Sequence, residues 1–184
     1  MPIAGAGKMQ RGLLVTGLAI ALLCATLAAR AEIVVTDATG ADVRLGAAAQ
    51  RIVSLAPHIT ELLYAAGAGG KLVGNVEYGD YPVQAKALPK VGGYTRPDLE
   101  AILALKPDLV IAWQSGNPPA ALARLRAMGI TVFVSQPDRI ADVAVELEHY
   151  GRLAGAEAQA NAAAASFRTR LAALKNQYAQ RPVV

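Results

Sequence analysis

The sequence predicts an α/β fold: a mainly parallel sheet covered by helices, with a long helix at its C-terminal end. Short apolar runs rich in branched residues alternate with segments of helical spacing, and the connections are too long for simple hairpins. After the last of these units, residues 156–180 are rich in Ala and contain no Gly or Pro. The predicted organisation is an α/β lobe over residues 32–154, followed by a helix over residues 155–181.

The first elements are a hairpin and a strand–helix–strand unit. Residues 33–45 contain two apolar runs around a Gly-containing turn, which is the pattern of a small hairpin. Residues 51–55 and 71–75 are apolar runs with branched side chains and predict two strands. Between them, residues 58–66 have helical spacing, and Gly67 is placed to end that helix.

The middle of the chain predicts a loop, two helices and a strand. Prolines and paired glycines make residues 78–93 mostly loop. Residues 95–105 begin with a proline and an acid in the first turn, which favours a helix start there. Residues 108–113 are the most continuous apolar run and predict a buried strand. Asn117 can cap the next helix, with Pro118 at its first position.

The last elements are a strand and two helices. Residues 131–135 predict a strand, and Asp138 is placed to cap a helix at residues 139–153. The Ala-rich segment, about 25 residues long, would form a helix of roughly 37 Å with an apolar stripe. Val183-Val184 resembles the opening of another strand, so the chain is expected to stop in mid-fold.

The composition fits one domain or one lobe of a larger fold. The 184 residues are 54% apolar, which excludes a disordered chain. One Cys and two His exclude a disulfide framework, a multi-Cys zinc site and a His-rich metal site. The net charge of +4 arises mainly from the first 31 residues, which hold three basic residues and no acid. Because the rest is nearly balanced and has no basic stripe, no nucleic-acid partner is expected.

Residues 1–31 have the pattern of a secretory signal peptide. Lys8 and Arg11 form a positive region, residues 13–27 are almost wholly apolar, and Ala29-Arg30-Ala31 supplies a small-x-small cleavage site. The apolar run is shorter than the roughly 20 residues that a membrane-spanning helix needs. We therefore expect cleavage before residue 32 and a periplasmic location.

Cys24 raises lipoprotein processing as an alternative to simple cleavage. The residue before it is Leu23, where small residues are normally required, so this alternative is disfavoured. Cleavage before Glu32 would remove the only Cys and leave a cysteine-free mature chain, which suits an oxidising compartment.

The glycines near residue 70 do not make a nucleotide-binding loop. A dinucleotide fingerprint would need another glycine where Leu72 stands, and a phosphate loop would need a serine or threonine there. The rest of the chain offers no recognisable trio of nucleophile, base and orienting acid. We therefore expect no enzyme activity, no cofactor and no protein-bound metal ion.

Four titratable residues remain to be interpreted. His58 could be a base or metal ligand at a strand end, or a capping or pocket-wall residue. His149 lies mid-helix among polar residues and is expected to be solvated. Glu146 and Glu148 are two positions apart and do not share a helix face, so both are expected to be ordinary surface charges.

Aromatic and polar side chains follow successive predicted strands. Pro57 and His58 follow the first, Tyr78 the second and Trp113 the third, while Tyr94 precedes a helix. Because the ends of parallel strands lie along one edge of a sheet, these residues are expected to line a common cleft. Trp113, the only Trp, can stack on a flat ligand there; the alternative is that it is simply core at a strand end.

Longer stretches of the chain resemble a known family. They are residues 51–67, 77–82, 90–93 and 99–113. These stretches resemble the periplasmic substrate-binding proteins of metal-chelate ABC importers, which serve cobalamin, ferric siderophores and haem. Gly116-Asn117 after the Trp most closely resembles the cobalamin-binding members. The likeness covers essentially all of residues 33–182.

The resemblance implies two α/β lobes joined by one long helix, with the ligand in the cleft between them. The Ala-rich helix would be that link, and the second lobe would be absent after residue 184. Strand ends and resemblance together nominate the ligand-binding residues Pro57, His58, Tyr78, Tyr94, Trp113, Gly116 and Asn117. The family's acid that docks onto the permease is expected just after Asn117, where this chain has Pro118-Pro119, so none is assigned.

We expect a monomeric binding protein that captures cobalamin in the periplasm and delivers it to an ABC importer permease, here in truncated form. Half a cleft predicts weak binding, because association must overcome its ordering cost. The alternatives are a haem or ferric-siderophore binder of the same class, and a truncated product without a transport role. A chelatase-like enzyme that depends on His58 is least favoured, because an export signal and the lack of an acid–base pair count against it.

Overall fold

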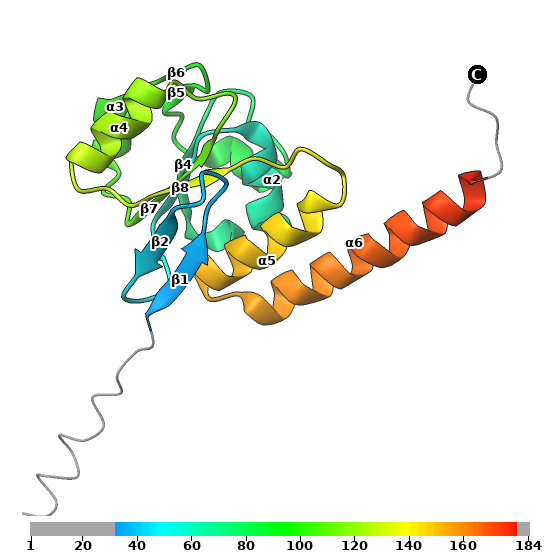
Figure 1. Ribbon diagram of the computed structural model, residues 1–184. Helices are drawn as coiled ribbons and strands as arrows, with labels where there is room; N and C mark the ends of the chain where they lie inside the picture. Colours follow the sequence, from blue (N-terminus) through cyan, green and yellow to red (C-terminus); the bar gives the residue numbers. More distant parts are fainter. Residues whose placement is uncertain (1–31, 180–184) are drawn as a thin grey trace, which may run out of the picture. The chain divides into compact units, whose positions relative to one another are not determined.

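The computed structural model describes residues 32–179 and contains a four-stranded parallel sheet flanked by helices (Figure 1). Its strands lie in the order β4-β3-β7-β8. They are β3 (Ile52–Ser54), β4 (Leu72–Asn75), β7 (Leu109–Trp113) and β8 (Val132–Ser135). The predicted fold class is confirmed. The signal peptide, its Cys24 alternative and the strand expected at residues 183–184 lie outside the described residues.

The N-terminal hairpin is formed as predicted and covers part of the edge strand β8. β1 (Ile33–Thr36) pairs antiparallel with β2 (Asp42–Leu45). The Asp37 carboxylate accepts hydrogen bonds from backbone N–H groups of its own turn and, at 3.3 Å, from Val134 of β8. The Ala38 N–H donates to the Val134 carbonyl at 2.8 Å. These bonds pair backbone groups that an exposed sheet edge would otherwise leave free.

The strands bury both faces because branched apolar residues alternate between two cores. Ile52 and Ile111 enter one core, and Val53 and Val110 enter the other. The first core is covered by α2 (Pro57–Ala65) and α5 (Asp142–Ala154), the second by α3 (Leu99–Ala104) and α4 (Pro119–Ala127). Figure 1 shows these two pairs of helices on opposite sides of the sheet. Covered faces are what the long connections between parallel strands require.

The helix expected from residue 95 begins later, after a short ribbon. β5 (Gly92–Gly93) pairs with β6 (Arg96–Pro97), so the first residues of the expected helix are extended. Asp98 is the N-cap of α3, and its carboxylate accepts hydrogen bonds from the N–H groups of Glu100 and Ala101, both at 3.0 Å. The acid was correctly placed at the helix start, but the proline lies before the helix.

Two further helix starts differ from the prediction. Pro118 takes the N-cap position of α4, and the Asn117 side chain bonds elsewhere. α5 begins at Asp142, after a turn in which Asp142 accepts a hydrogen bond from the Arg139 N–H at 2.9 Å. Asp138 instead accepts a hydrogen bond from Gln136 at 2.8 Å. Asn117 is thus used for tertiary contacts and Asp138 for a local bond within its loop, and spacing alone indicates neither.

Two residues of α5 are more buried than expected. Glu146 is only 7% exposed, so the prediction of a surface charge is wrong. His149 is half-buried, with its ring 5.8 Å from the Phe133 ring and with its Nδ1 buried, so the prediction of a solvated side chain is also wrong. α5 packs against the sheet, α2 and α6, and this buries a wider arc than a surface helix does.

The long C-terminal helix is α6 (Glu157–Tyr178), and it packs on α5 through small residues. Ala160 and Ala164 are buried against the core, and Arg168 donates two hydrogen bonds to the Glu148 carboxylate. From residue 168 onward the helix is almost wholly exposed. The helix lies where a linking helix is expected, and its role as a link between two lobes stays a prediction.

Candidate ligand-binding site

The site begins at the point where the chain reverses its direction across the sheet. From β3 the chain moves outward to β4, then crosses to the other side of β3 to form β7 and β8. β3 and β7 are therefore neighbours, and the helices that follow them, α2 and α4, lie on opposite faces of the sheet. Ligands of open α/β sheets bind in the crevice beyond the carboxyl ends of such a strand pair.

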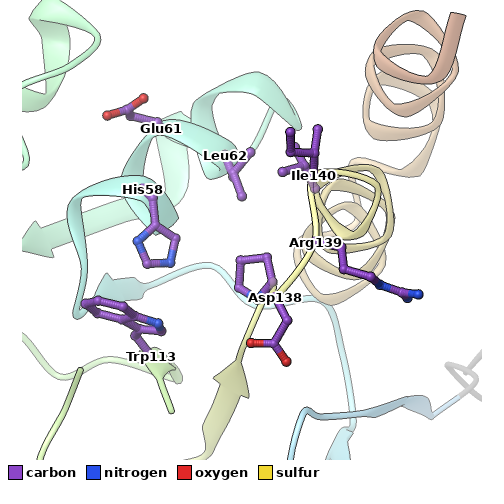
Figure 2. Close-up of a pocket in the computed structure, with 9 residues that line it drawn as sticks. His58, Glu61, Leu62, Trp113, Asp138, Arg139 and Ile140 are labelled. Atoms are coloured by element: carbon purple, nitrogen blue, oxygen red, sulfur yellow. The ribbon is translucent and has the colours of Figure 1, made fainter. Parts of the chain in front are cut away.

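His58 and Trp113 are brought together at this crevice. His58 lies in the first turn of α2 after β3, and Trp113 ends β7. Their ring centroids are 5.2 Å apart at an interplanar angle of 84°, and Figure 2 shows the imidazole edge directed at the indole. Both rings line a cavity of about 450 Å³. Its other lining residues are Glu61, Leu62, Pro137, Asp138, Arg139, Ile140 and Val143.

Burial sets the charge state of His58. The side chain is half-buried, its Nε2 is shielded from solvent, and that atom has no hydrogen-bond partner in the described residues. Burial lowers the pKa of His58 below its ordinary value, because the charged ring loses hydration. A lowered pKa favours the neutral imidazole, and the ring forms part of the cavity wall. This agrees with the pocket-wall alternative.

Tyr94 belongs to the same aromatic cluster, whereas Tyr78 stands apart from it. The Tyr94 ring lies 5.8 Å from the Trp113 ring at 48° and is partly exposed. Tyr78 follows β4, is 80% exposed and has a left-handed backbone with φ of 64°. That conformation is unfavourable for a residue with a side chain, so the turn imposes it. Pro57 is half-buried and opens α2.

Gly116 lets the chain pass directly against the indole. A Cβ atom on Gly116 would lie 1.9 Å from Cε3 of Trp113, which no real side chain can do. The Gly116 N–H donates to the Trp113 carbonyl at 3.3 Å, so the turn folds back under its own aromatic residue. Gly116 thus fixes where the indole ring can lie.

Asn117 is buried, and its side-chain amide forms hydrogen bonds with three backbone groups. It is 3% exposed. Its Oδ1 accepts the Trp113 N–H at 2.6 Å, and its Nδ2 donates to the carbonyls of Leu55 and Tyr94 at 2.9 and 2.8 Å. Its own N–H donates to the Trp113 carbonyl at 2.9 Å.

The charges around the cavity are predominantly acidic. Arg139 is the one cation among the described lining residues, and it is paired with Asp142 at 2.9 Å. The hydrogen bond from Arg139 holds the pKa of the Asp142 carboxyl below its ordinary value. Glu61 and Asp138 also line the cavity, and neither forms an ion pair within residues 32–179.

The cavity includes residues that the sequence reasoning missed. Residues 137–140 follow β8, so the strand-end argument that nominated Trp113 would also have found them. Leu62 lies one turn after His58 on the same side of α2, and helical spacing could have identified it. Val143 is placed by the later start of α5, which the sequence did not reveal.

Two kinds of feature are not found in the described residues. From residue 32 to 179, no group of three or more His, Cys, Asp or Glu side chains is arranged to hold a metal ion. No helix in that part of the chain is long and apolar enough to cross a membrane.

Comparison with known proteins points to one family. A family model described as "Periplasmic binding protein" matches residues 52–184. The chain is 47% identical over 131 residues to the vitamin B12-binding protein of Vibrio cholerae serotype O1, and 44% identical over 133 residues to that of Yersinia pestis. These alignments cover 71% and 72% of this chain but 48% of each relative. The chain therefore spans about half the length of the curated relatives it matches.

Solved structures give the same picture. The periplasmic vitamin B12-binding protein of Vibrio cholerae aligns with a TM-score of 0.71 at 46% identity, covering 74% of this chain and 53% of that one. A periplasmic heme-binding protein from Pseudomonas aeruginosa aligns with a TM-score of 0.66 at 30% identity, covering 71% of this chain and 47% of that one. The fold is thus similar to that of proteins with two different macrocyclic ligands.

Proposed function

The chain belongs to the periplasmic binding protein family, and from that membership we propose that it forms the first ligand-binding lobe of an ABC importer's substrate-binding protein. The observation that carries the proposal is the aromatic cluster of His58, Tyr94 and Trp113 at the crevice between β3 and β7. A lobe of this kind binds a ligand with one face of a cleft and needs no covalent chemistry. The relatives are binding proteins as well.

We assign cobalamin as the ligand in this proposal. The chain is closer in sequence to the vitamin B12-binding relatives, at 44–47% identity, than to the heme-binding one at 30%. A corrinoid is large, flat and amphipathic. Rings such as Trp113 and Tyr94 can cover its apolar surface, while loop amides and carboxylates meet its peripheral carboxamides.

The charges of the cavity support cobalamin over haem. Haem carries two propionate carboxylates, which would face Glu61 and Asp138 without an unpaired cation among the described lining residues. Like charges that lose water on binding repel each other and cost affinity. The carboxamides of cobalamin are neutral and can donate hydrogen bonds to these acids. Haem or a ferric siderophore is the second candidate, since the fold accommodates heme in a relative.

We further propose that the chain works in the periplasm and passes its ligand to a membrane permease. The signal-like residues 1–31 support export, and N-terminal sequencing of the exported chain, expected to begin at Glu32, tests it. Tyr78 and Tyr81, which are 80% and 70% exposed, are available for contact with the ligand or with another part of the assembly.

A chimera tests the ligand assignment. The second half of the Vibrio cholerae relative, appended after residue 184, would complete the cleft. We expect this chimera to retain cyanocobalamin in equilibrium dialysis and to show quenching of Trp113 fluorescence, while haem is not retained. Trp113→Ala should weaken binding by at least about 10-fold, because it removes a stacking surface. Retention of haem alone would favour the second candidate, and retention of neither would refute the proposed function.

A further inference from the structure

Three separate chain segments meet at the crevice. They are the end of β3 at Leu55, the β5–β6 turn at Tyr94 and the end of β7 at Trp113. Asn117 bonds to all three. Each contact satisfies a backbone group, and a buried backbone group left unpaired is costly.

The chemistry of the amide leaves Asn117 little to offer a ligand. An asparagine side chain has two N–H donors and one carbonyl acceptor. Both donors are directed to carbonyls, at 2.9 and 2.8 Å, and the acceptor receives an N–H at 2.6 Å. With 3% of the residue exposed, the side chain lies beneath the site. The expectation that Asn117 contacts the ligand therefore gives way to a different role.

Asn117 bonds to both backbone groups of Trp113, its N–H and its carbonyl. The Trp113 N–H donates to the Asn117 side chain, and the Trp113 carbonyl accepts the Asn117 N–H. The same side chain holds the Tyr94 carbonyl, and the two rings lie 5.8 Å apart. One amide thus links the backbones that carry the two aromatic rings of the cluster.

We propose that Asn117 is a positioning residue that sets the relative placement of Trp113 and Tyr94, and thereby the shape of the aromatic surface offered to the ligand. Its significance for binding rests on the proposed function, whereas its effect on Trp113 can be measured without a ligand. The basis is the set of three side-chain hydrogen bonds, each to a different segment of the crevice.

Trp113 is the only Trp, so its fluorescence in the full chain reports on the site directly. Asn117→Ala is expected to raise acrylamide quenching of Trp113 about 2-fold or more and to shift its emission to longer wavelength, because the turn loosens. Asn117→Asp keeps an acceptor for the Trp113 N–H but directs a carboxylate at two carbonyls. It should behave like Asn117→Ala at pH 7 and recover part of the parent's quenching near pH 4, where the introduced carboxyl can donate one hydrogen bond.

Thr60→Val is the matched control. It removes another buried hydrogen bond, Ser54 Oγ to Thr60 Oγ1 at 2.6 Å, and leaves the three hydrogen bonds of the Asn117 side chain in place. Far-UV circular dichroism and thermal melting report on the fold of every variant. The control is expected to melt at a lower temperature while its Trp113 quenching stays like that of the parent.

The ligand arm uses cyanocobalamin and the chimera described above. Asn117→Ala should raise the dissociation constant about 10-fold, the equivalent of one or two lost hydrogen bonds. The proposal is overturned if Asn117→Ala has the quenching and affinity of the parent. It is also overturned if Thr60→Val changes the quenching as much as Asn117→Ala does. If the unsubstituted chimera binds no cyanocobalamin, the proposed function fails, and the quenching data still decide whether Asn117 positions Trp113.

Discussion

At the residue scale, the molecule shows two kinds of buried polar side chain. Asn117 has a partner for each of its donors and for its acceptor, whereas Glu146 is left with one carboxylate oxygen without a partner in the described residues. Glu146 lies near Ser135 and Tyr150, whose hydroxyls are hydrogen-bonded to each other at 2.9 Å. Burial raises the pKa of the Glu146 carboxyl above its ordinary value, although hydrogen bonds from the two hydroxyls oppose the shift.

The raised pKa of Glu146 predicts a pH-dependent loss of stability. A carboxyl that binds its proton more tightly in the folded state stabilises the fold below its unfolded pKa of 4.5, and that contribution is lost as pH rises through the folded pKa. Glu146→Gln carries no charge and should therefore melt at a higher temperature than the parent at pH 7.5, with a smaller difference at pH 4.5. Thermal melting at both pH values measures this.

Glu77→Gln is the control for Glu146→Gln, since Glu77 is exposed. It should shift the melting temperature little at either pH. A parent chain whose melting temperature does not fall relative to Glu146→Gln between pH 4.5 and 7.5 would contradict the prediction.

The sequence could not reveal these roles because they depend on distant partners. Asn117 before two prolines has the local pattern of a helix cap, yet its partners lie 62 and 23 residues away at Leu55 and Tyr94. Glu146 is placed on a helix by its spacing, but the number of elements packed on that helix decides whether it is exposed. Trp113 and His58 could be nominated, because a strand end is a local signal.

At the element scale, α5 and α6 pack closely against each other. A Cβ atom on Gly151 would lie 2.2 Å from the Cβ of Ala160, so these helices touch through small residues. Gly155, with φ of 64°, ends α5 in a left-handed conformation that glycine tolerates, and Lys71 donates a hydrogen bond to the last carbonyl of α5 at Ala154. The turn between α5 and α6 is therefore fixed by the hydrogen bond from Lys71 at the end of α5 and by the close contact between Gly151 and Ala160.

Gly151→Val is expected to destabilise the chain by overpacking this crossing. The free energy of unfolding should fall by about 1–3 kcal/mol. For a domain of this size, each kcal/mol lowers the melting temperature by about 2–4 °C. Ala160→Gly in the same chain removes the opposing methyl group and should restore part of the loss. Thermal denaturation of the single and double variants measures both effects.

Gly46→Val is the control for Gly151→Val, because a Cβ atom at Gly46 has no neighbour within 4 Å. It should leave the melting temperature close to that of the parent. If Gly151→Val also melted like the parent, α6 would have to move away from α5 at no cost, and the packing argument would be wrong.

Strands were predicted more closely than helix starts, for a physical reason. A buried parallel strand needs a continuous run of branched residues, and residues 108–113 supply one that the structure uses as β7. A helix start depends on which cap the tertiary structure leaves free. Asp98 stands at the helix start as predicted, although as the N-cap and not in the first turn, whereas Asp138 accepts a hydrogen bond from Gln136 and α5 starts four residues after it.

At the scale of the whole molecule, the proposed function makes the chain one face of a ligand site. It spans about half of its curated relatives. The cavity next to Trp113 is open to solvent and bounded by α2, α5 and the loop after β8. The fold class followed from the alternation of elements, and the existence of a crevice followed from parallel strand ends. The size and charge of the cavity did not, because they depend on side chains from three segments that lie far apart in the sequence, residues 58–62, 113 and 137–143.

The chain alone is expected to bind cyanocobalamin weakly. Half a cleft leaves much of a large ligand in water, while the cost of immobilising it is nearly the same. Equilibrium dialysis of residues 32–184 should give an affinity at least about 10-fold lower than that of the chimera with a second lobe. Sub-micromolar retention by the chain itself would contradict this and show that one lobe suffices.

The separation between the two cores and the loops beyond the strand ends has an evolutionary consequence. The cores are built from strand interiors and helix faces, whereas four of the residues that line the cavity, 137–140, lie in the connection after β8 and belong to neither core. Randomised libraries at those four positions can therefore be selected for new macrocycles at little risk to the scaffold. Under the proposed function, substitutions at these loop positions can change which ligand is bound while both cores stay intact.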